Sequence, residues 1–547
     1  MCDCSGGFHS WNNAAAQLED LEEKKNSIDG LDAKSKEAAD NYFELTVFSE
    51  HTLGEAYDFI VNYFELGFDW WPRYDGYDSY VDYFNALLEW YEPLKEKLDE
   101  DYSVPSCLET EWNNYLSNYE LNESILQKMS LGYRLNDYFR FNSAINLSKR
   151  CKTRDDQLYN ELLDGLGKEM DFAVSQKSIA SKLAEEIDKY ADLDKSQREN
   201  YEFENIHMNK INVQYDVLDV IYPSLYRTYD AFAIIRTGCL GGRRDITVEA
   251  EIPGFTQKYR QTFRLDPSYK AIFIKPPMLT GDLDLGAAKD AQINISIYEK
   301  DGTTLVDAKT FPVVIKSKND FSYIQNEYGT ATLDNFLCFL TPNAAAIDAL
   351  KRVAIDEISN MTSGKMQSLV GYQETGFGHY VGTYLQAAGI MRALYDVGVR
   401  YNADGFTPDA GSQHILFPEE VLQKQSGLCI ETTLTVASAL QSADMNVFIV
   451  LPTGHAQVAV EIWNKEGEGT GEYFLIETTA LSSDSNNNDI YIDYANLLLN
   501  NNPDDLPTNY PISYYSAEEW AAYIAQSGAY IIDCGDAAGM GLASFSN

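Results

Sequence analysis

The stretch Gly427-Leu428-Cys429 begins a predicted helix that extends to about Ser442 and precedes three predicted strands. The strands cover residues 447–451, 456–463 and 473–476. Each is a short apolar run bounded by turn residues. A helix followed by consecutive strands predicts an α+β arrangement for this part of the chain.

A thiol, an imidazole and a carboxylate occupy the ends of these predicted elements. Cys429 stands at the helix start, His455 at the start of the second strand, and Glu477 at the end of the third. The N–H groups and dipole of a helix N-terminus stabilise a thiolate, and a histidine is the usual base for such a thiol. A carboxylate that accepts the other ring N–H fixes the histidine tautomer. The pattern predicts Cys429, His455 and Glu477 as catalytic nucleophile, base and orienting group.

Each of these residues also has a structural explanation when it is taken alone, because all three types are common at helix starts or strand ends. The catalytic hypothesis therefore depends on their occurring together in this order. Gly427 would permit a tight bend and close approach of a substrate to the sulfur. The expected oxyanion donors are the backbone N–H of Cys429 and the side chain of Gln425 or Gln423. No metal site and no cofactor are expected.

Residues 418–479 resemble the transglutaminase-like superfamily, whose core pairs a Gly-x-Cys helix start with a histidine on one strand and an aspartate on the next. Gly427-Leu428-Cys429 matches the first element and His455-Ala456 the second, while Glu477-Thr478-Thr479 stands where the family usually has Asp-x-Thr. Gln457 also departs from the pattern, since an aromatic residue often follows His-Ala. The resemblance implies a papain-like core with a cysteine nucleophile, a histidine base and an acidic orienting residue. It leaves hydrolysis, transamidation and an inactive core open.

The whole chain is predicted to be a multidomain α+β protein. Residues 1–10 are expected to form a flexible tether, and residues 11–222 a helical region with bundle packing. Residues 223–318 alternate apolar and polar side chains between turn signals, which predicts a small β-sandwich. Residues 319–547 then form the transglutaminase-like domain that the resemblance implies.

One long amphipathic helix is predicted within the helical region. Its apolar side chains recur every four positions, which indicates a single packed face. They are Leu158, Leu162, Leu166, Met170 and Val174.

Acidic residues outnumber basic ones by 84 to 42, which gives a formal charge of −42. A surface of this charge repels phosphate backbones, so nucleic acid is not expected as a partner. The expected partner is a peptide or protein substrate, which follows from the thiol chemistry and the family resemblance. No apolar run reaches the roughly 18 residues that a membrane-spanning helix needs.

The first residues, Met1-Cys2-Asp3-Cys4, resemble a bacterial lipoprotein that begins at its lipidated cysteine, with Cys2 as the anchor. This interpretation predicts a cell-surface or extracellular location. The alternative is that these are ordinary terminal cysteines of a cytoplasmic protein.

These features predict a thiol-dependent acyl-transfer enzyme, a cysteine peptidase or amidase that acts on peptide-type amide bonds, with hydrolysis favoured over transamidation. The alternative is a non-enzymatic cell-surface binding protein whose transglutaminase-like core is a relic. The two hypotheses differ in whether His455 controls the reactivity of Cys429.

Overall fold

A computed structural model describes most of the chain from Leu108 onward. The described residues are 82, 86, 89, 108–135, 137–202, 210–240, 243–265, 269–280, 283–322, 333–374, 376–403, 412–464, 467–482, 488–502, 505–537 and 542. The predicted tether at residues 1–10, with its candidate anchor Cys2, lies outside them. The described part contains both helices and several separate sheets, which confirms a mixed α and β protein.

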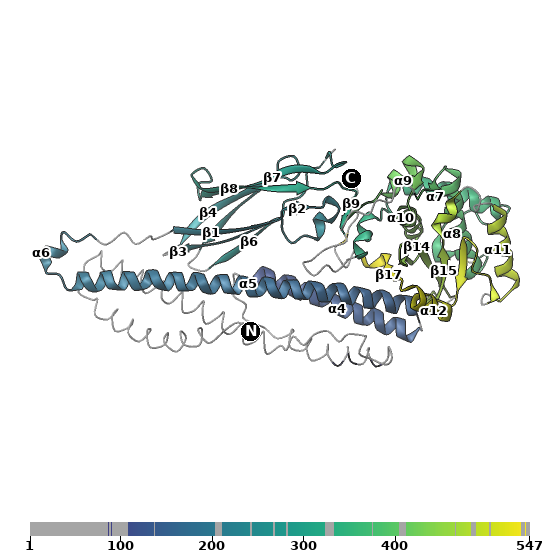
Figure 1. Cartoon of the computed structure of the whole chain (residues 1–547), viewed down its shortest axis with the longest axis horizontal. Coiled ribbons are helices and arrows are strands. Elements are labelled where there is room, and N and C mark those ends of the chain that lie inside the picture. The colour runs from purple at the N-terminus through teal and green to yellow at the C-terminus, as the bar shows by residue number, and fades with distance from the viewer. Residues whose placement is uncertain are drawn as a thin grey trace.

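Two long helices lie side by side and form a helical hairpin (Figure 1). They are α4 (Glu109–Arg134) and α5 (Tyr138–Ala191), and the short α6 (Lys195–Arg198) follows at the far end. Asp137 caps α5 by accepting the N–H of Arg140 at 3.0 Å. With 54 residues, α5 runs along much of the length of the molecule.

The predicted apolar stripe on α5 is correct at its start and wrong at its end. Leu158, Leu162 and Leu166 are buried, but Val174 is 59% exposed. Each four-residue step advances about 40° past a full turn, because a helix has 3.6 residues per turn. After four steps, position 174 lies about 160° around the helix axis from position 158. Near position 174 the buried face is therefore formed by residues at other positions.

The predicted helical region ends too late. Two strands, β1 (Lys210–Val217) and β2 (Val220–Ile221), precede residue 222. Ile211, Val213 and Tyr215 alternate along β1 and pack against the apolar core of the strands that follow. This period of two is that of a strand, and it places the start of the β-rich unit at residue 210 instead of 223.

The β-rich unit consists of two sheets that share one apolar core. The first has the order β1-β3-β6, and the second has the order β2-β8-β7-β4-β5. The strands not yet given bounds are β3 (Ala233–Leu240), β4 (Arg244–Glu251), β5 (Tyr259–Leu265), β6 (Lys270–Ile274), β7 (Lys289–Glu299) and β8 (Leu305–Ile315). Apart from the parallel pair β2 and β8, the pairings are antiparallel.

A third unit contains a five-stranded antiparallel sheet of order β16-β15-β14-β13-β17. Its strands are β13 (Val447–Leu451), β14 (Gln457–Trp463), β15 (Gly469–Ile476), β16 (Ile512–Tyr515) and β17 (Tyr530–Asp533). Its helices are α7 (Ala345–Met361), α8 (His379–Asp396), α9 (Pro418–Lys424), α10 (Cys429–Gln441), α11 (Asn488–Asn500) and α12 (Ala517–Ser527). Two small strand pairs join loops of this unit. They are β9 (Asp320–Ser322) with β11 (Ser412–His414), and β10 (Arg400–Tyr401) with β12 (Ser426–Gly427).

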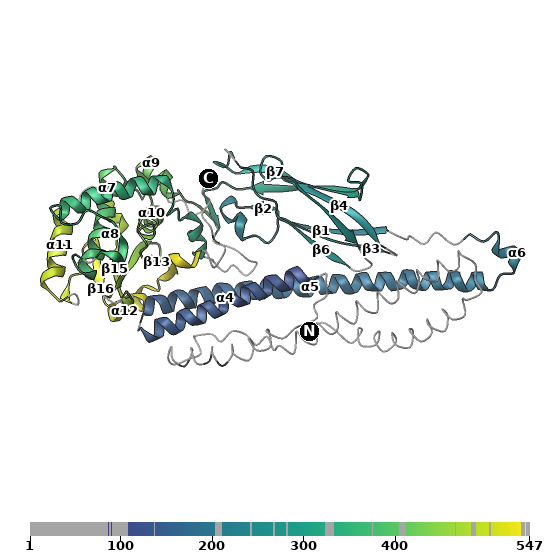
Figure 2. The ribbon, with the colours of Figure 1, turned by 180° about the vertical axis from the view of Figure 1, so that it is seen from behind.

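The five-stranded sheet has a separate core on each face. Val458 and Val460 of β14 join the large core that includes α10, whereas Ala459 between them joins a smaller one. The smaller core contains Phe139 of α5 and Trp520 of α12. The sheet therefore lies between α10 on one side and α12 with the start of α5 on the other (Figure 2).

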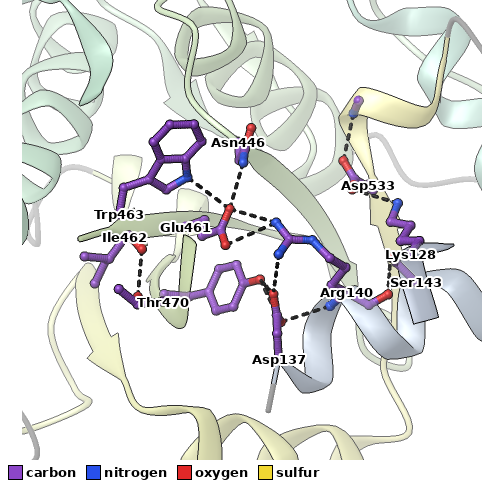
Figure 3. Close-up of polar contacts among 12 residues, drawn as sticks. Lys128, Asp137, Arg140, Ser143, Asn446, Glu461, Ile462, Trp463, Thr470 and Asp533 are labelled. Carbon is purple, nitrogen blue, oxygen red and sulfur yellow. Dashed lines mark hydrogen bonds and ion pairs between the residues drawn. The ribbon is translucent and has the colours of Figure 1, made fainter. Parts of the chain in front are cut away.

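The helical hairpin is fixed to this sheet by aromatic packing and buried charges. Phe139 is fully buried, with its ring centroid 4.4 Å from that of Trp520. Arg140 pairs with Asp137 at 3.2 Å and with Glu461 of β14 at 3.1 Å (Figure 3). The hydroxyl of Tyr473 on β15 donates to Asp137 at 2.8 Å, so the cluster spans the junction.

A second charged cluster lies beside the first. Lys128 of α4 pairs with Asp533 at 2.7 Å and with Asp536 at 2.6 Å, and its side chain is only 12% exposed. Burial favours the neutral lysine, but the two carboxylates outweigh it, and the pKa of Lys128 rises. Both helices of the hairpin thus have charged contacts with the sheet unit. None of the described helices has an apolar stretch long enough to cross a membrane.

Candidate active site

Cys429 is the first residue of α10. Leu428, in extended conformation, is the N-cap, and the backbone N–H groups of Cys429 and Ile430 belong to the first turn, which has no intrahelical acceptors. The carboxylate of Glu431 accepts the N–H of Leu428 at 2.7 Å and that of Leu416 at 2.9 Å. Cys429 is partly exposed, whereas the other cysteines within the described residues are buried. Glu431 therefore restrains the helix start, where Cys429 is partly exposed.

Gly427 is required by packing and not by an unusual backbone angle. A Cβ there would lie 3.2 Å from Cγ2 of Thr432 and 3.3 Å from Cγ1 of Val421. Gly427 is absent from the glycines with positive φ, so its place at the end of β12, before α10, does not depend on a left-handed backbone. Its carbonyl accepts the N–H of Asn402 at 3.0 Å, which fixes the approach to Cys429.

His455 lies in the turn before β14, two residues ahead of the strand. The predicted strand start at residue 456 is thus one residue early. The backbone N–H of His455 donates to the carbonyl of Pro452 at 3.0 Å, and Gly454 takes the positive φ of 74° that this turn needs. The side chain is 30% exposed. The turn, more than the strand, determines where the ring lies.

The three predicted catalytic side chains come together. Nε2 of His455 is 2.8 Å from Oε2 of Glu477, and the ring is also hydrogen-bonded to the side chain of Cys429. Because Nε2 contacts Glu477, Nδ1 is left for the sulfur. This is the chain of thiol, imidazole and carboxylate that thiol acyl transfer requires.

Glu477 follows β15 directly and has hydrogen-bond donors on both oxygens. Oε1 accepts the N–H of Thr479 at 3.0 Å and its hydroxyl at 2.5 Å. Oε2 accepts from His455 and from Nε2 of Gln457, each at 2.8 Å. The longer side chain of glutamate, compared with aspartate, therefore still ends in a fully bonded carboxylate.

Opposite charges are favoured on the histidine and the glutamate. The pKa of His455 rises to about 10, first through its hydrogen bond to Cys429 and then through Glu477. Burial would raise the pKa of Glu477, but hydrogen bonds from His455 and Thr479 outweigh it and lower the pKa to about 2. Both shifts favour an imidazolium on His455 beside a carboxylate on Glu477.

Buried threonines connect the two sides of the site. The hydroxyl of Thr432 donates to Thr478 at 2.9 Å, and Thr433 lies within 3.3 Å of the same hydroxyl. All three residues are fully buried. They join α10 to the segment after β15 and so fix the separation of Cys429 from Glu477. The sequence signal for them was a pair of adjacent threonines near the start of α10.

Gln425 does not contact the thiol site as predicted, because its side-chain amide is bonded elsewhere. It ends α9 in the left-handed conformation, with φ of 55°. Its Nε2 donates to the carbonyl of Val397 at 2.6 Å, and its side chain lies against Gly398. The amide therefore stabilises the loop before β10. Of the expected oxyanion donors, the backbone N–H of Cys429 lies in the first turn of α10, where it has no intrahelical acceptor.

Three residues near the site had no role predicted from the sequence. Tyr401 pairs with Gly427 across β10 and β12. Burial raises the pKa of Tyr401, and the charges of Cys429 and Glu477 add to the effect, so its hydroxyl lies near both. Gln457 contacts Glu477 directly, and Tyr523 contacts Gln457. No local motif reveals such neighbours, because they come from separate elements.

The described residues contain no group of three or more histidine, cysteine, aspartate and glutamate side chains that could hold a metal ion. No protein-family model, curated protein or solved structure matches the chain.

Proposed function

We propose that this protein is a thiol-dependent acyl-transfer enzyme that hydrolyses peptide-type amide bonds. One observation carries the proposal: Cys429 at the start of α10 is hydrogen-bonded to His455, which is 2.8 Å from Glu477. Each group has the position that its role needs, because the nucleophile lies at a helix N-terminus and the base is oriented by a carboxylate.

The reaction begins when the Cys429 thiolate attacks the amide carbonyl and forms a tetrahedral oxyanion, which the backbone N–H of Cys429 stabilises. The carbon–nitrogen bond then breaks, and the His455 imidazolium gives its proton to the leaving amine. An acyl-thioester remains on the sulfur. His455, now neutral, takes a proton from water as that water attacks the thioester. The carbon–sulfur bond breaks, a carboxylic acid leaves, and the thiolate–imidazolium pair is restored.

Hydrolysis is favoured over transamidation because water reaches the site. The side chains of His455 and Glu477 are 30% and 31% exposed, and Cys429 is partly exposed. A transamidating site would have to exclude water until an amine arrived.

The finer architecture is also part of this proposal. Residues 319–547 would form a transglutaminase-like, papain-like domain, supported by the order of a cysteine-bearing helix, a histidine before one strand and a carboxylate after the next. The two sheets that begin at residue 210 would form a β-sandwich domain, and the helical hairpin would belong to a helical N-terminal region. The lipid anchor at Cys2 and the cell-surface location stay predictions.

The proposal predicts that Cys429 is reactive in a way that depends on His455. A chloroacetamide probe at pH 7 should label Cys429 in the native protein, and His455→Ala should reduce the labelling rate by about 10² or more, because the base and its charge are lost. Mass spectrometry of the labelled peptide measures the rate.

His414→Ala is the matched control, since His414 is an exposed histidine that pairs with Asp320. Its labelling rate should equal that of the native protein. Equal rates in the native protein and His455→Ala would contradict an enzymatic site and favour a non-enzymatic binding protein with an inactive core.

A further inference from the structure

Gln457 joins the candidate active site to a tyrosine on another helix. Its Nε2 donates to Oε2 of Glu477 at 2.8 Å, and its Oε1 accepts the hydroxyl of Tyr523 at 2.7 Å. Tyr523 belongs to α12, on the face of the sheet opposite α10. The side chain of Gln457 thus links the segment at Glu477 to α12, which are distant from each other in the sequence.

The chemistry of this contact requires an amide. A carboxylate accepts hydrogen bonds but cannot donate, so the amide must turn its NH₂ group toward Glu477. Its oxygen then faces away and accepts the tyrosine O–H. A glutamate at position 457 would place a second negative charge beside Glu477. An apolar residue would remove one of the donors to Glu477 and the acceptor of the Tyr523 hydroxyl.

Burial makes the contact rigid. Gln457 is only 8% exposed, and the ring of Tyr523 packs edge-on against the buried Trp520 with centroids 5.3 Å apart. Tyr523 therefore has a fixed place from which to orient the amide. Burial raises the pKa of Tyr523 to about 12, so its hydroxyl keeps the proton that it donates.

The amide completes the restraint on the glutamate. Thr479 holds Oε1 of Glu477 through two hydrogen bonds, and Gln457 holds Oε2, the oxygen that contacts His455. With both oxygens held, the carboxylate cannot turn about its last bond. Without Gln457, Oε2 keeps only the contact with His455, and its orientation toward the imidazole is less restrained.

From this geometry we propose that Gln457 is a positioning residue for the Glu477–His455 pair, and that Tyr523 acts on the pair only by orienting Gln457. The proposal rests on the proposed function, because it concerns the same Cys429 site. It assigns roles to two residues that touch neither the sulfur nor its imidazole.

The test uses the pH dependence of Cys429 alkylation by iodoacetamide in the full chain. Gln457→Met keeps the length of the side chain but removes both hydrogen bonds. The imidazolium of His455 then loses part of its stabilisation. We expect the alkaline limit of the alkylation profile, which is the pH at which His455 loses its proton, to fall by about one pH unit. Tyr523→Phe should produce a smaller shift in the same direction. A defect of packing alone would change the melting temperature but not this limit.

The double variant gives the sharper result. If Tyr523 acts only through Gln457, Gln457→Met with Tyr523→Phe should shift the limit no further than Gln457→Met does alone. Additive shifts would overturn the role assigned to Tyr523, and an unchanged profile in Gln457→Met would overturn that of Gln457. If Gln457→Met does not fold, Tyr523→Phe still tests the link, because it removes only a hydroxyl, and an unchanged profile there would count against the proposal.

Tyr515→Phe is the matched control, because its ring stacks on Trp520 with centroids 4.6 Å apart in the same aromatic cluster. It should leave the profile unchanged. The two proposals fail differently. An unreactive Cys429 in the native protein contradicts the proposed function. A reactive native Cys429 whose pH profile is the same in Gln457→Met contradicts only the positioning role.

Discussion

At the scale of the residue, the arrangement of charge around His455 distinguishes this site from a chance meeting of polar groups. The imidazole lies between a sulfur and a carboxylate, and the carboxylate accepts four hydrogen bonds. The contact between His455 and Glu477 raises the pKa of the histidine and lowers that of the glutamate, and the hydrogen bond to Cys429 raises the pKa of His455 further. Because each group stabilises the charged form of the other, protonation should affect stability as well as reactivity.

The raised pKa of His455 predicts a pH-dependent contribution to stability. The folded value is about 10, against an ordinary value of 6.5, so the folded state binds the proton more tightly than the unfolded chain does. The stabilisation is complete below pH 6.5 and is lost as the pH rises toward 10. Comparing the native protein with His455→Gln, we expect a difference of about 1 kcal/mol near pH 6, limited by solvent screening at this partly exposed site.

Urea unfolding at intervals from pH 6 to pH 10 measures this difference. It should shrink steadily across that range. A difference that stays constant up to pH 10 would mean that the folded protein does not hold an extra proton on His455.

At the scale of the element, the start of α10 depends on Glu431. This residue is 4% exposed, yet its two carboxylate oxygens accept backbone N–H groups from Leu416 and Leu428. Burial raises the pKa of Glu431 although both hydrogen bonds oppose the change. One buried side chain therefore holds together the loop before α9 and the turn that presents Cys429.

Glu431→Ala should destabilise the protein by about 2 to 4 kcal/mol, because two partly buried N–H groups lose their acceptors. Labelling of Cys429 should also slow, since the helix start becomes less ordered. Thermal unfolding and the probe rate measure the two effects.

Glu431→Gln is the matched variant, as it keeps the shape and one oxygen acceptor. Its loss of stability should be less than that of Glu431→Ala. Equal losses in the two variants would mean that side-chain volume, and not hydrogen bonding, is what α10 requires at this position.

At the scale of the whole molecule, the helical hairpin is joined to the sheet unit across a large separation in sequence. Phe139 fills the small core beneath the sheet, and Arg140 lies between Asp137 and Glu461 (Figure 3). Burial raises the pKa of both carboxylates, and Arg140 opposes that change in each. Arg140 thus stabilises the charged forms of the two buried carboxylates at this junction.

Arg140→Met should destabilise the protein by about 3 to 5 kcal/mol, because two buried carboxylates lose their common partner. Acidification should restore part of the loss, since protonation neutralises the same two groups. Thermal unfolding at two pH values measures both effects.

Arg154→Met is the matched control on the same helix. Arg154 pairs with Asp230, but the two side chains are 31% and 32% exposed, so a change of only about 0 to 1 kcal/mol is expected. Similar losses in the two variants would contradict a special role for the buried cluster.

Local patterns in the sequence were sufficient for several features of this protein. The bounds of β13 agree with the predicted strand, and α10 begins at Cys429, because short-range periodicity and turn residues decide where such elements start and end. The order of a thiol, an imidazole and a carboxylate also lies in the sequence itself. By contrast, β1 was mistaken for helix, since its alternation extends over only eight residues beside a long helical region.

Other features were decided only by the tertiary structure. Gln425 and Gln457 have the same side chain and lie close to Cys429 or His455 in sequence, yet one amide bonds to the loop at Val397 and the other to Glu477. Which partner an amide finds depends on the segments packed around it, and Val397, Glu477 and Tyr523 are 20 to 66 residues away from the glutamines that they contact. The sequence determined which chemical groups are present, and the packing of distant elements determined which of them meet.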